Sequence, residues 1–294
     1  MAQQLILPDE RVVDYLISGA NNGFPLLFVH GTPGSYLPVP SFASACEKKG
    51  IKILTLSRAG YGGSTRKKGR RVVDMVSDIQ ALLQHLGIKR CFVGGWSGGG
   101  PHALACAARL PECVATLCIA GVAPADAEDL DFLAGQGEDN IQEFQAAMKG
   151  EEALAKFCGD MRLELLNTDA RGIVESMSSI LPDVDKQALL EDSTMGQYCA
   201  DLFQEGLKSN ADGWVDDDLE FVQPWGFDLS EVKVPVLLYQ GSEDKMVPYA
   251  HGEWLSKHLP QEKLISHLQQ GQGHISIVVT HTEDMLDELL AIPR

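Results

Sequence analysis

The chain has 294 residues, of which 45% are hydrophobic and 22% charged; this ordinary globular composition excludes a disordered chain, a fibrous repeat and a small disulfide scaffold. The net charge of -17 is concentrated in residues 124–228, which hold 25 acidic and 6 basic side chains, whereas the remaining residues hold 16 acidic and 18 basic ones. Nucleic acids and anionic membranes require a basic face, so neither is an expected partner, and the short basic run 66–71 is interpreted as a solvated loop.

Short β-rich runs alternate with helical patterns over the first 120 residues, which predicts crossover units and a largely parallel sheet. Residues 72–87 place apolar side chains at three- and four-residue spacing, and predict an amphipathic helix that ends at Gly87. A second helix, rich in small residues, is expected from Gly99 and should stop before Pro111. The five predicted strands are 12–17, 25–30, 51–57, 91–96 and 114–120.

The β signal stops after Val122 and helical patterns replace it until about residue 227. It then resumes to the end of the chain. We therefore expect an α/β core formed by residues 1–122 and 228–294, with a helical cap, 123–227, inserted between the two parts. The later elements are helical patterns at 141–158 and 184–207, strands at 235–240 and 263–268, and helices near 251–259 and 277–292.

The sequence Gly95-Trp96-Ser97-Gly98-Gly99 lies between an apolar run and a helical pattern, which is the context of a nucleophile elbow. A serine on such a turn is forced toward positive φ, and glycines two residues before and after it relieve the resulting collisions. The hydroxyl of Ser97 is then exposed. The alternative is a glycine-rich turn without chemistry, because G-x-S-x-G also arises by chance.

The segment HGTPG, residues 30–34, follows an earlier predicted strand, at the place where a serine hydrolase needs a second oxyanion donor. We expect the backbone N–H groups of Thr32 and Gly98 to stabilise the negative oxygen of a tetrahedral intermediate. His30 could act as a base. We favour a role for His30 in supporting this loop together with Gly31, because a base at His30 would leave His274 without a function.

Ser97, Asp244 and His274 occur in the chain order Ser, Asp, His, and each follows a predicted strand. A serine hydroxyl needs a base to take its proton and a carboxylate to orient that base. We predict that these residues form a catalytic triad. Asp126 is the alternative acid, and Glu243 is expected to face away from the histidine if Asp244 faces it.

Two further features concern the environment of the protein. The opening MAQQLILPDERVV lacks the basic region and apolar core of a secretory signal, and no run of 18 apolar residues occurs, so we expect a soluble, cytoplasmic protein. Seven cysteines without a CxxC pair favour buried reduced thiols over a metal site or a disulfide framework. They are Cys46, Cys91, Cys106, Cys113, Cys118, Cys158 and Cys199.

With these residues in place, the chain resembles the α/β-hydrolase superfamily over essentially its whole length. The resemblance is carried by LPDERVVDYLISG, HGTPG, SRAGYGGS, GWSGG, GSEDKMVP and GQGH. It implies an eight-stranded, mostly parallel sheet with helices on both faces, a helical cap after strand six, and no cofactor. The sequence departs from the family pattern at residues 57–60, where Ser-Arg-Ala-Gly replaces the usual Asp-Arg-Pro-Gly.

The resemblance covers several chemistries. Epoxide hydrolases and haloalkane dehalogenases use aspartate at the elbow, so Ser97 argues against both, whereas hydroxynitrile lyases and cofactor-free haloperoxidases keep serine and stay open. Proline iminopeptidases resemble the HGTPG loop, and an acidic cap could hold a free amine. Their tryptophan follows the elbow serine, however, whereas Trp96 precedes Ser97. A non-catalytic small-molecule receptor is a further alternative.

We predict a serine hydrolase that cleaves a carboxylic ester or lactone. The sequence does not indicate the oligomeric state or the natural substrate. The acidity of the cap predicts either attraction of cationic substrates or a solvated surface that keeps the protein soluble. Seven apolar cap residues are candidates for the substrate pocket and equally for the cap core: Phe132, Phe144, Phe157, Met161, Met177, Trp214 and Trp225.

Overall fold

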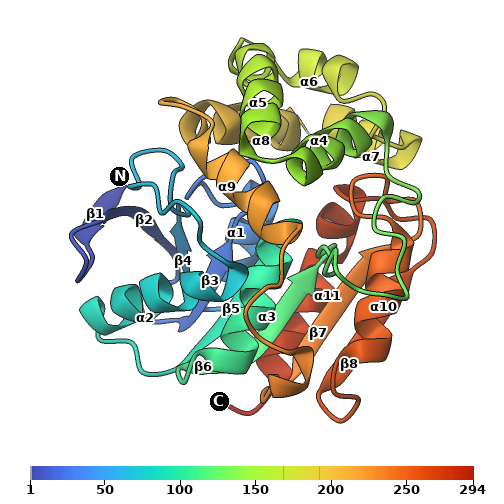
Figure 1. The fold of residues 1–294 in the computed structure, drawn as a ribbon. Coiled ribbons are helices and arrows are strands. Elements are labelled where there is room, and N and C mark those ends of the chain that lie inside the picture. Colours follow the sequence, from blue (N-terminus) through green and yellow to red (C-terminus); the bar gives the residue numbers. More distant parts are fainter. Residues whose placement is uncertain (1, 168, 192) are drawn as a thin grey trace.

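A computed structural model describes residues 2–167, 169–191 and 193–294. Its centre is an eight-stranded sheet with the order β1-β2-β4-β3-β5-β6-β7-β8 (Figure 1). β1 and β2 pair antiparallel, as do β2 and β4, and the other five neighbouring pairs are parallel. The strands are β1 (Gln3–Ile6), β2 (Val12–Gly19), β3 (Phe24–Val29), β4 (Ile51–Leu56), β5 (Cys91–Trp96), β6 (Cys113–Ile119), β7 (Val236–Gly241) and β8 (Leu264–Gln269).

The predicted α/β fold with a mostly parallel eight-stranded sheet is confirmed. All seven strands expected from β-rich runs are present, and their ends shift by at most two residues. β1 was not predicted individually. Its four residues are mostly exposed and include two glutamines, so they lack the buried apolar pattern of the inner strands.

Helices cover both faces of the sheet, as expected (Figure 1). Alternate side chains of one strand enter different cores, because successive residues of a strand point to opposite faces. Leu26 and Phe28 of β3 lie in the core that holds α1 (Pro40–Lys48) and α11 (Ser276–Ala291). Leu27 and Val29 lie in the other core, with α2 (Met75–His85), α3 (Gly99–Arg109) and α10 (Tyr249–His258).

The chain between β6 and β7 is helical in its described part and gathers at one end of the sheet (Figure 1). The expected helix at 141–158 is divided at Gly150, whose φ of 111° suits glycine and ends one helix as the next begins. Residue 192, within the expected helix at 184–207, lies outside the described residues. The helices are α4 (Glu138–Lys149), α5 (Glu151–Leu166), α6 (Ala170–Ser176), α7 (Asp183–Glu191), α8 (Ser193–Gly206) and α9 (Asp212–Phe221).

Two short 3-10 helices complete the described elements, η1 (Val72–Asp74) before α2 and η2 (Leu229–Glu231) before β7. All seven cysteines are buried free thiols, in agreement with the sequence. Among the helices that the structure describes, none combines the length and apolar character that crossing a bilayer requires.

Candidate active site

Ser97 lies on the turn between β5 and α3 with a φ of +57°, a region that few residues other than glycine adopt. A Cβ atom at Gly95 would overlap the backbone of Gly99, and one at Gly99 would overlap the carbonyl of Val29. Both positions therefore need glycine. Gly31 lies against the serine, because a Cβ atom built there would be 3.2 Å from the Ser97 Cβ.

His274 and Asp244 are joined by a hydrogen bond of 2.7 Å between Nδ1 and Oδ2. The Asp244 carboxylate is itself held, because its Oδ1 accepts hydrogen bonds from the N–H groups of Met246 (2.8 Å) and Val247 (2.9 Å). The side-chain amide of Gln240 donates to Oδ2 at 3.2 Å. These bonds fix the carboxylate on the turn after β7, where it can orient the imidazole.

The environment of His274 favours its protonated form. Burial lowers the pKa of His274, but the negative charge of Asp244, its hydrogen bond and the charge of Asp185 outweigh burial, so the pKa lies above its ordinary value. Trp96 stacks on the imidazole with ring centroids 5.5 Å apart, and its indole N–H donates to the His274 carbonyl at 3.1 Å. The imidazole is therefore held at Nδ1 by Asp244 and on its face by Trp96.

The two other acidic candidates are placed elsewhere. Asp126 is exposed and lines a separate surface pocket with Trp254 and His258. Glu243 is exposed, and its Oε1 accepts a hydrogen bond from Ser242. The carboxylate that contacts the imidazole of His274 belongs to Asp244.

The two expected oxyanion donors lie beside Ser97. Thr32, Gly98 and Ser97 line one pocket, and a Cβ atom at Gly98 would collide with the side chain of Thr32. Gly98 immediately precedes α3, so its N–H has no carbonyl partner within that helix. The positive end of the helix dipole also points toward this region, which favours a negative oxygen there.

His30 is buried, and both ring nitrogens contact the backbone. Nε2 accepts a hydrogen bond from the Arg58 N–H at 3.0 Å, so Nδ1 carries the proton and donates it to the Gly31 carbonyl at 2.7 Å. Burial and the charge of Arg58 hold the pKa of His30 well below its ordinary value. These contacts are those of a neutral side chain that supports the loop, and they leave neither nitrogen free to act as a base.

Arg58 is a site residue that the sequence analysis did not single out. Its buried guanidinium donates to the carbonyls of His30 and Gly31, to Thr32 Oγ1 at 2.8 Å, and to Asp217 on α9. Thr32 in turn donates to Asp217 at 2.6 Å. The loop that carries the expected oxyanion donor Thr32 is thus attached to α9, one of the helices between β6 and β7. An arginine in the otherwise altered SRAG stretch was the available signal.

The interpretation of residues 66–71 as a solvated loop is wrong for Arg70, and Arg66 is only partly exposed. Arg70 is buried and pairs with Asp217 and Glu220, and Arg66 pairs with Asp216 at 2.8 Å. The carboxylates belong to α9, so the pattern of local charge could not show this pairing. Five acidic residues between β6 and β7 are likewise buried rather than on a solvated surface: Asp185, Asp216, Asp217, Asp218 and Glu220.

His102, Asp217 and Glu220 bring potential metal-ligand atoms within 4.8 Å of one another. The guanidinium groups of Arg58 and Arg70 already bind these two carboxylates. Their positive charges oppose the binding of a cation, so the cluster has the character of an ion-pair network.

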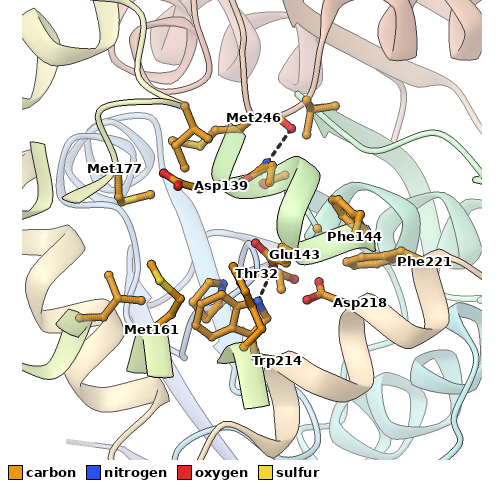
Figure 2. A pocket seen from close by; sticks show the side chains of 18 of the residues that line it. Thr32, Asp139, Glu143, Phe144, Met161, Met177, Trp214, Asp218, Phe221 and Met246 are labelled. Carbon is orange, nitrogen blue, oxygen red and sulfur yellow. Dashed lines mark hydrogen bonds between the residues drawn. The ribbon is translucent and has the colours of Figure 1, made fainter. Parts of the chain in front are cut away.

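Two pockets meet at Ser97. The first lies among α4, α5 and α9 (Figure 2), and the second contains Ser97, His274, Gly31 and Trp96. Five of the seven apolar candidates line the first pocket, and Met177 also lines the second. Phe132 instead packs on Phe144 and His251. Trp225 stacks on Phe227 near the surface pocket of Asp126. The five are Phe144, Phe157, Met161, Met177 and Trp214.

Comparisons with known proteins agree with this architecture. The family described as alpha/beta hydrolase fold matches residues 25–278. A probable proline iminopeptidase from Leptolyngbya boryana is 24% identical, with 93% of this chain and 90% of the relative covered. The enol-lactonase from Burkholderia xenovorans LB400 superposes with a TM-score of 0.70 at 16% identity, covering 98% of this chain and 100% of that chain. A thermophilic esterase from Thermogutta terrifontis superposes with a TM-score of 0.66 at 20% identity, covering 99% and 98%.

Proposed function

The chain belongs to the α/β-hydrolase fold family, and we propose that within this family it is a serine hydrolase that cleaves a carboxylic ester or lactone through an acyl-enzyme. One observation carries the proposal. His274, which is bonded to Asp244 at 2.7 Å, lines a pocket that also contains Ser97 on its strained turn. A nucleophile, a base and an orienting acid are the groups that acyl transfer requires.

In the proposed reaction, Ser97 Oγ attacks the substrate carbonyl while His274 Nε2 takes the hydroxyl proton. Asp244 holds the Nδ1 proton and stabilises the imidazolium. The N–H groups of Thr32 and Gly98 stabilise the oxyanion. His274 then protonates the departing alkoxide, and a water molecule, deprotonated by His274, attacks the acyl-enzyme to release the acid and restore Ser97.

We further propose that residues 123–227 act as the cap that shapes the substrate pocket. The first pocket supports this role, because α4, α5 and α9 contribute much of its lining while Thr32, Ser97 and Gly98 belong to the core. Both pockets contain Ser97, and together they would hold the acyl and alcohol parts of an ester. An intramolecular ester, a lactone, would extend into both.

A substrate series tests the reaction class. We expect wild-type protein to hydrolyse p-nitrophenyl esters or lactones and Ser97→Ala to lose this activity, whereas prolyl p-nitroanilide should be a poor substrate. Preferred cleavage of the anilide would instead support the aminopeptidase alternative, for which the iminopeptidase relative is a precedent. A fluorophosphonate should label Ser97 covalently. Absence of both turnover and labelling would support the non-catalytic receptor.

The pH dependence follows from the base. His274 must be neutral to accept a proton, so kcat/KM should rise with pH and level off above the pKa of His274 in the free enzyme. Because the pKa of His274 is raised, the midpoint of this rise should lie above the ordinary value of about 6.5. Asp244→Asn should shift the midpoint down.

This prediction is measured as kcat/KM for a neutral ester between about pH 5 and pH 9. Asp126→Asn is the matched control, because Asp126 is exposed and lies in a separate pocket; its midpoint should stay at the wild-type value. A midpoint below the ordinary histidine value would contradict the role of Asp244.

A further inference from the structure

Carboxyl groups lie in the largely apolar first pocket. Glu143 of α4 and Asp218 of α9 both line it, together with aromatic and methionine side chains (Figure 2). The Trp214 indole N–H donates to Glu143 Oε1 at 2.5 Å. Asp218 is 1% exposed, and its Oδ2 has no hydrogen-bond partner within the described residues. A buried carboxyl oxygen without a donor is costly in free energy unless a ligand supplies one.

Asp218 differs from the other buried acids of α9. Asp216 pairs with Arg66, Asp217 with Arg58 and Arg70, and Glu220 with Arg70. Among the described ion pairs, Asp218 has no basic partner, and it faces the substrate pocket. Asp139 of α4 also lines that pocket, and none of the described lining residues is a lysine or arginine.

The electrostatics agree with a missing positive charge. Burial and the neighbouring Glu143 carboxyl raise the pKa of Asp218 well above its ordinary value, and burial also raises the pKa of Glu143. Two neighbouring carboxyls in a buried pocket repel each other when both are ionised. A bound cation would offset this repulsion.

We propose that the first pocket binds the ammonium group of an amine-bearing ester or lactone, between the carboxyls of Glu143 and Asp218. The aromatic side chains of Trp214, Phe144 and Phe221 line the same pocket and add faces that attract a cation. This inference rests on the proposed hydrolase function and assigns its substrate class. In this proposal a cationic substrate is recognised by a local, desolvated contact with two carboxyls, and not by long-range attraction to an acidic surface.

The test compares two esters that differ in one group. Methyl 6-aminohexanoate carries an ammonium group where methyl heptanoate carries a methyl group. Shorter and longer members of the two series allow for the unknown depth of the site. We expect the amino ester to be preferred by the wild type. Glu143→Gln and Asp218→Asn should each lower the ratio of the two kcat/KM values by roughly 10- to 100-fold, the value of one charge-assisted contact.

Glu152→Gln provides the matched control, because Glu152 is an exposed acid at the start of α5 and its loss changes the net charge equally. Its ratio should equal that of the wild type. The proposal would be overturned if Glu143→Gln and Asp218→Asn kept the wild-type ratio. It would also be overturned if these variants lost as much kcat/KM with methyl 6-hydroxyhexanoate as with the amino ester, because the hydroxy ester carries a neutral hydrogen-bond donor in place of the ammonium group.

A binding experiment separates this proposal from the reaction. If wild-type protein hydrolyses none of the esters, the hydrolase function fails, whereas the ammonium site is still tested by calorimetric titration of Ser97→Ala with n-pentylammonium. We expect binding that Glu143→Gln weakens by roughly 10-fold or more. The ammonium site would be overturned if Ser97→Ala did not bind n-pentylammonium, or if Ser97→Ala with and without Glu143→Gln bound it equally.

A second and independent observation concerns Asp185 of α7. Its fully buried carboxylate accepts hydrogen bonds from three consecutive N–H groups, those of His274 (2.8 Å), Ile275 (3.0 Å) and Ser276 (2.8 Å). These groups begin α11, where backbone N–H groups lack helical partners. A Cβ atom at Gly273 would overlap the same carboxylate, so the loop before the histidine lies directly on it.

We infer that Asp185 is a positioning residue for His274, under the proposed hydrolase function. It fixes the backbone that carries the imidazole, and its charge adds to that of Asp244 in favouring the imidazolium. Asp185→Asn keeps one oxygen acceptor but removes the charge and one of the acceptor atoms. We expect kcat to fall by roughly 10- to 100-fold with little change in KM, because the base is misplaced relative to Ser97.

The pKa of His274, measured by NMR titration of its imidazole, gives a readout that does not depend on activity; it should fall in Asp185→Asn. Asp183→Asn is the control, since Asp183 is exposed on the same helix. If Asp185→Asn does not fold, Asp185→Glu keeps the charge with a longer side chain and should still lower kcat. The inference would be overturned if a folded Asp185 variant kept the wild-type kcat. It would also be overturned if the loss of kcat in Asp185→Asn matched the fraction of unfolded protein while the pKa of His274 stayed unchanged.

Discussion

Replacing Ser97 by alanine is expected to lower kcat for a neutral ester by roughly 10³-fold or more without unfolding the protein. The variant removes only the hydroxyl oxygen that attacks the carbonyl in the proposed mechanism, so the proposed acyl-enzyme could not form. The fold should be kept, because the strain at this turn belongs to the backbone, with a φ of +57°, and alanine meets it with a smaller side chain. Steady-state kinetics and a thermal melt check both parts.

His274→Ala and Asp244→Asn should each cause a loss of similar order, because the hydrogen bond of 2.7 Å joins His274 to Asp244, and in the proposed mechanism this pair acts as one unit with Ser97. The double variant Ser97→Ala/His274→Ala should therefore lose little more than Ser97→Ala alone. Ser77→Ala is a suitable control, since Ser77 bonds to the carbonyl of Asp74 away from the pocket. A near-normal kcat in Asp244→Asn would show that Asp244 is not the acid that orients His274.

Replacing Asp217 by alanine is expected to lower the free energy of unfolding by about 3–5 kcal/mol, the usual cost of removing one partner of a buried ion pair. Asp217 is fully buried and pairs with Arg58 and Arg70, which are themselves buried. Their guanidinium groups cannot reach water when the carboxylate is lost. Tyr61 and Thr32 also donate to this carboxylate, at 2.7 and 2.6 Å.

Equilibrium unfolding in urea measures this loss. Asp212→Ala is the matched control, because Asp212 lies at the start of the same helix, is 40% exposed and pairs with Arg66 at 3.2 Å. Its loss should cost less than about 1 kcal/mol, as for other exposed ion pairs. Equal destabilisation by the two variants would show that the buried network adds nothing. A fall in kcat of folded Asp217→Ala is also expected, since Thr32 loses its anchor.

Local patterns in the sequence determined much of the fold. Seven of the eight strands could be predicted because each is a short run of β-forming, apolar residues bounded by turn residues. The elbow was also visible locally, since Gly95 and Gly99 are needed within two residues of Ser97. The order of Ser97, Asp244 and His274 then restricted which side chains could meet at the ends of parallel strands.

Only the tertiary structure decided which charges are buried and what they contact. Arg58 meets Asp217 across 159 positions of sequence, and Asp185 meets His274 across 89. Hydrophobic periodicity and turn chemistry act between near neighbours, and neither indicates which distant surfaces the fold brings together. The acidic chain between β6 and β7 therefore could not be divided, from sequence alone, into exposed residues, the ion-paired Asp217, Asp185 with its carboxylate at the start of α11, and Asp218, which has no basic partner among the described residues. Their burial and partners follow from the packing of the helices between β6 and β7 onto the end of the sheet.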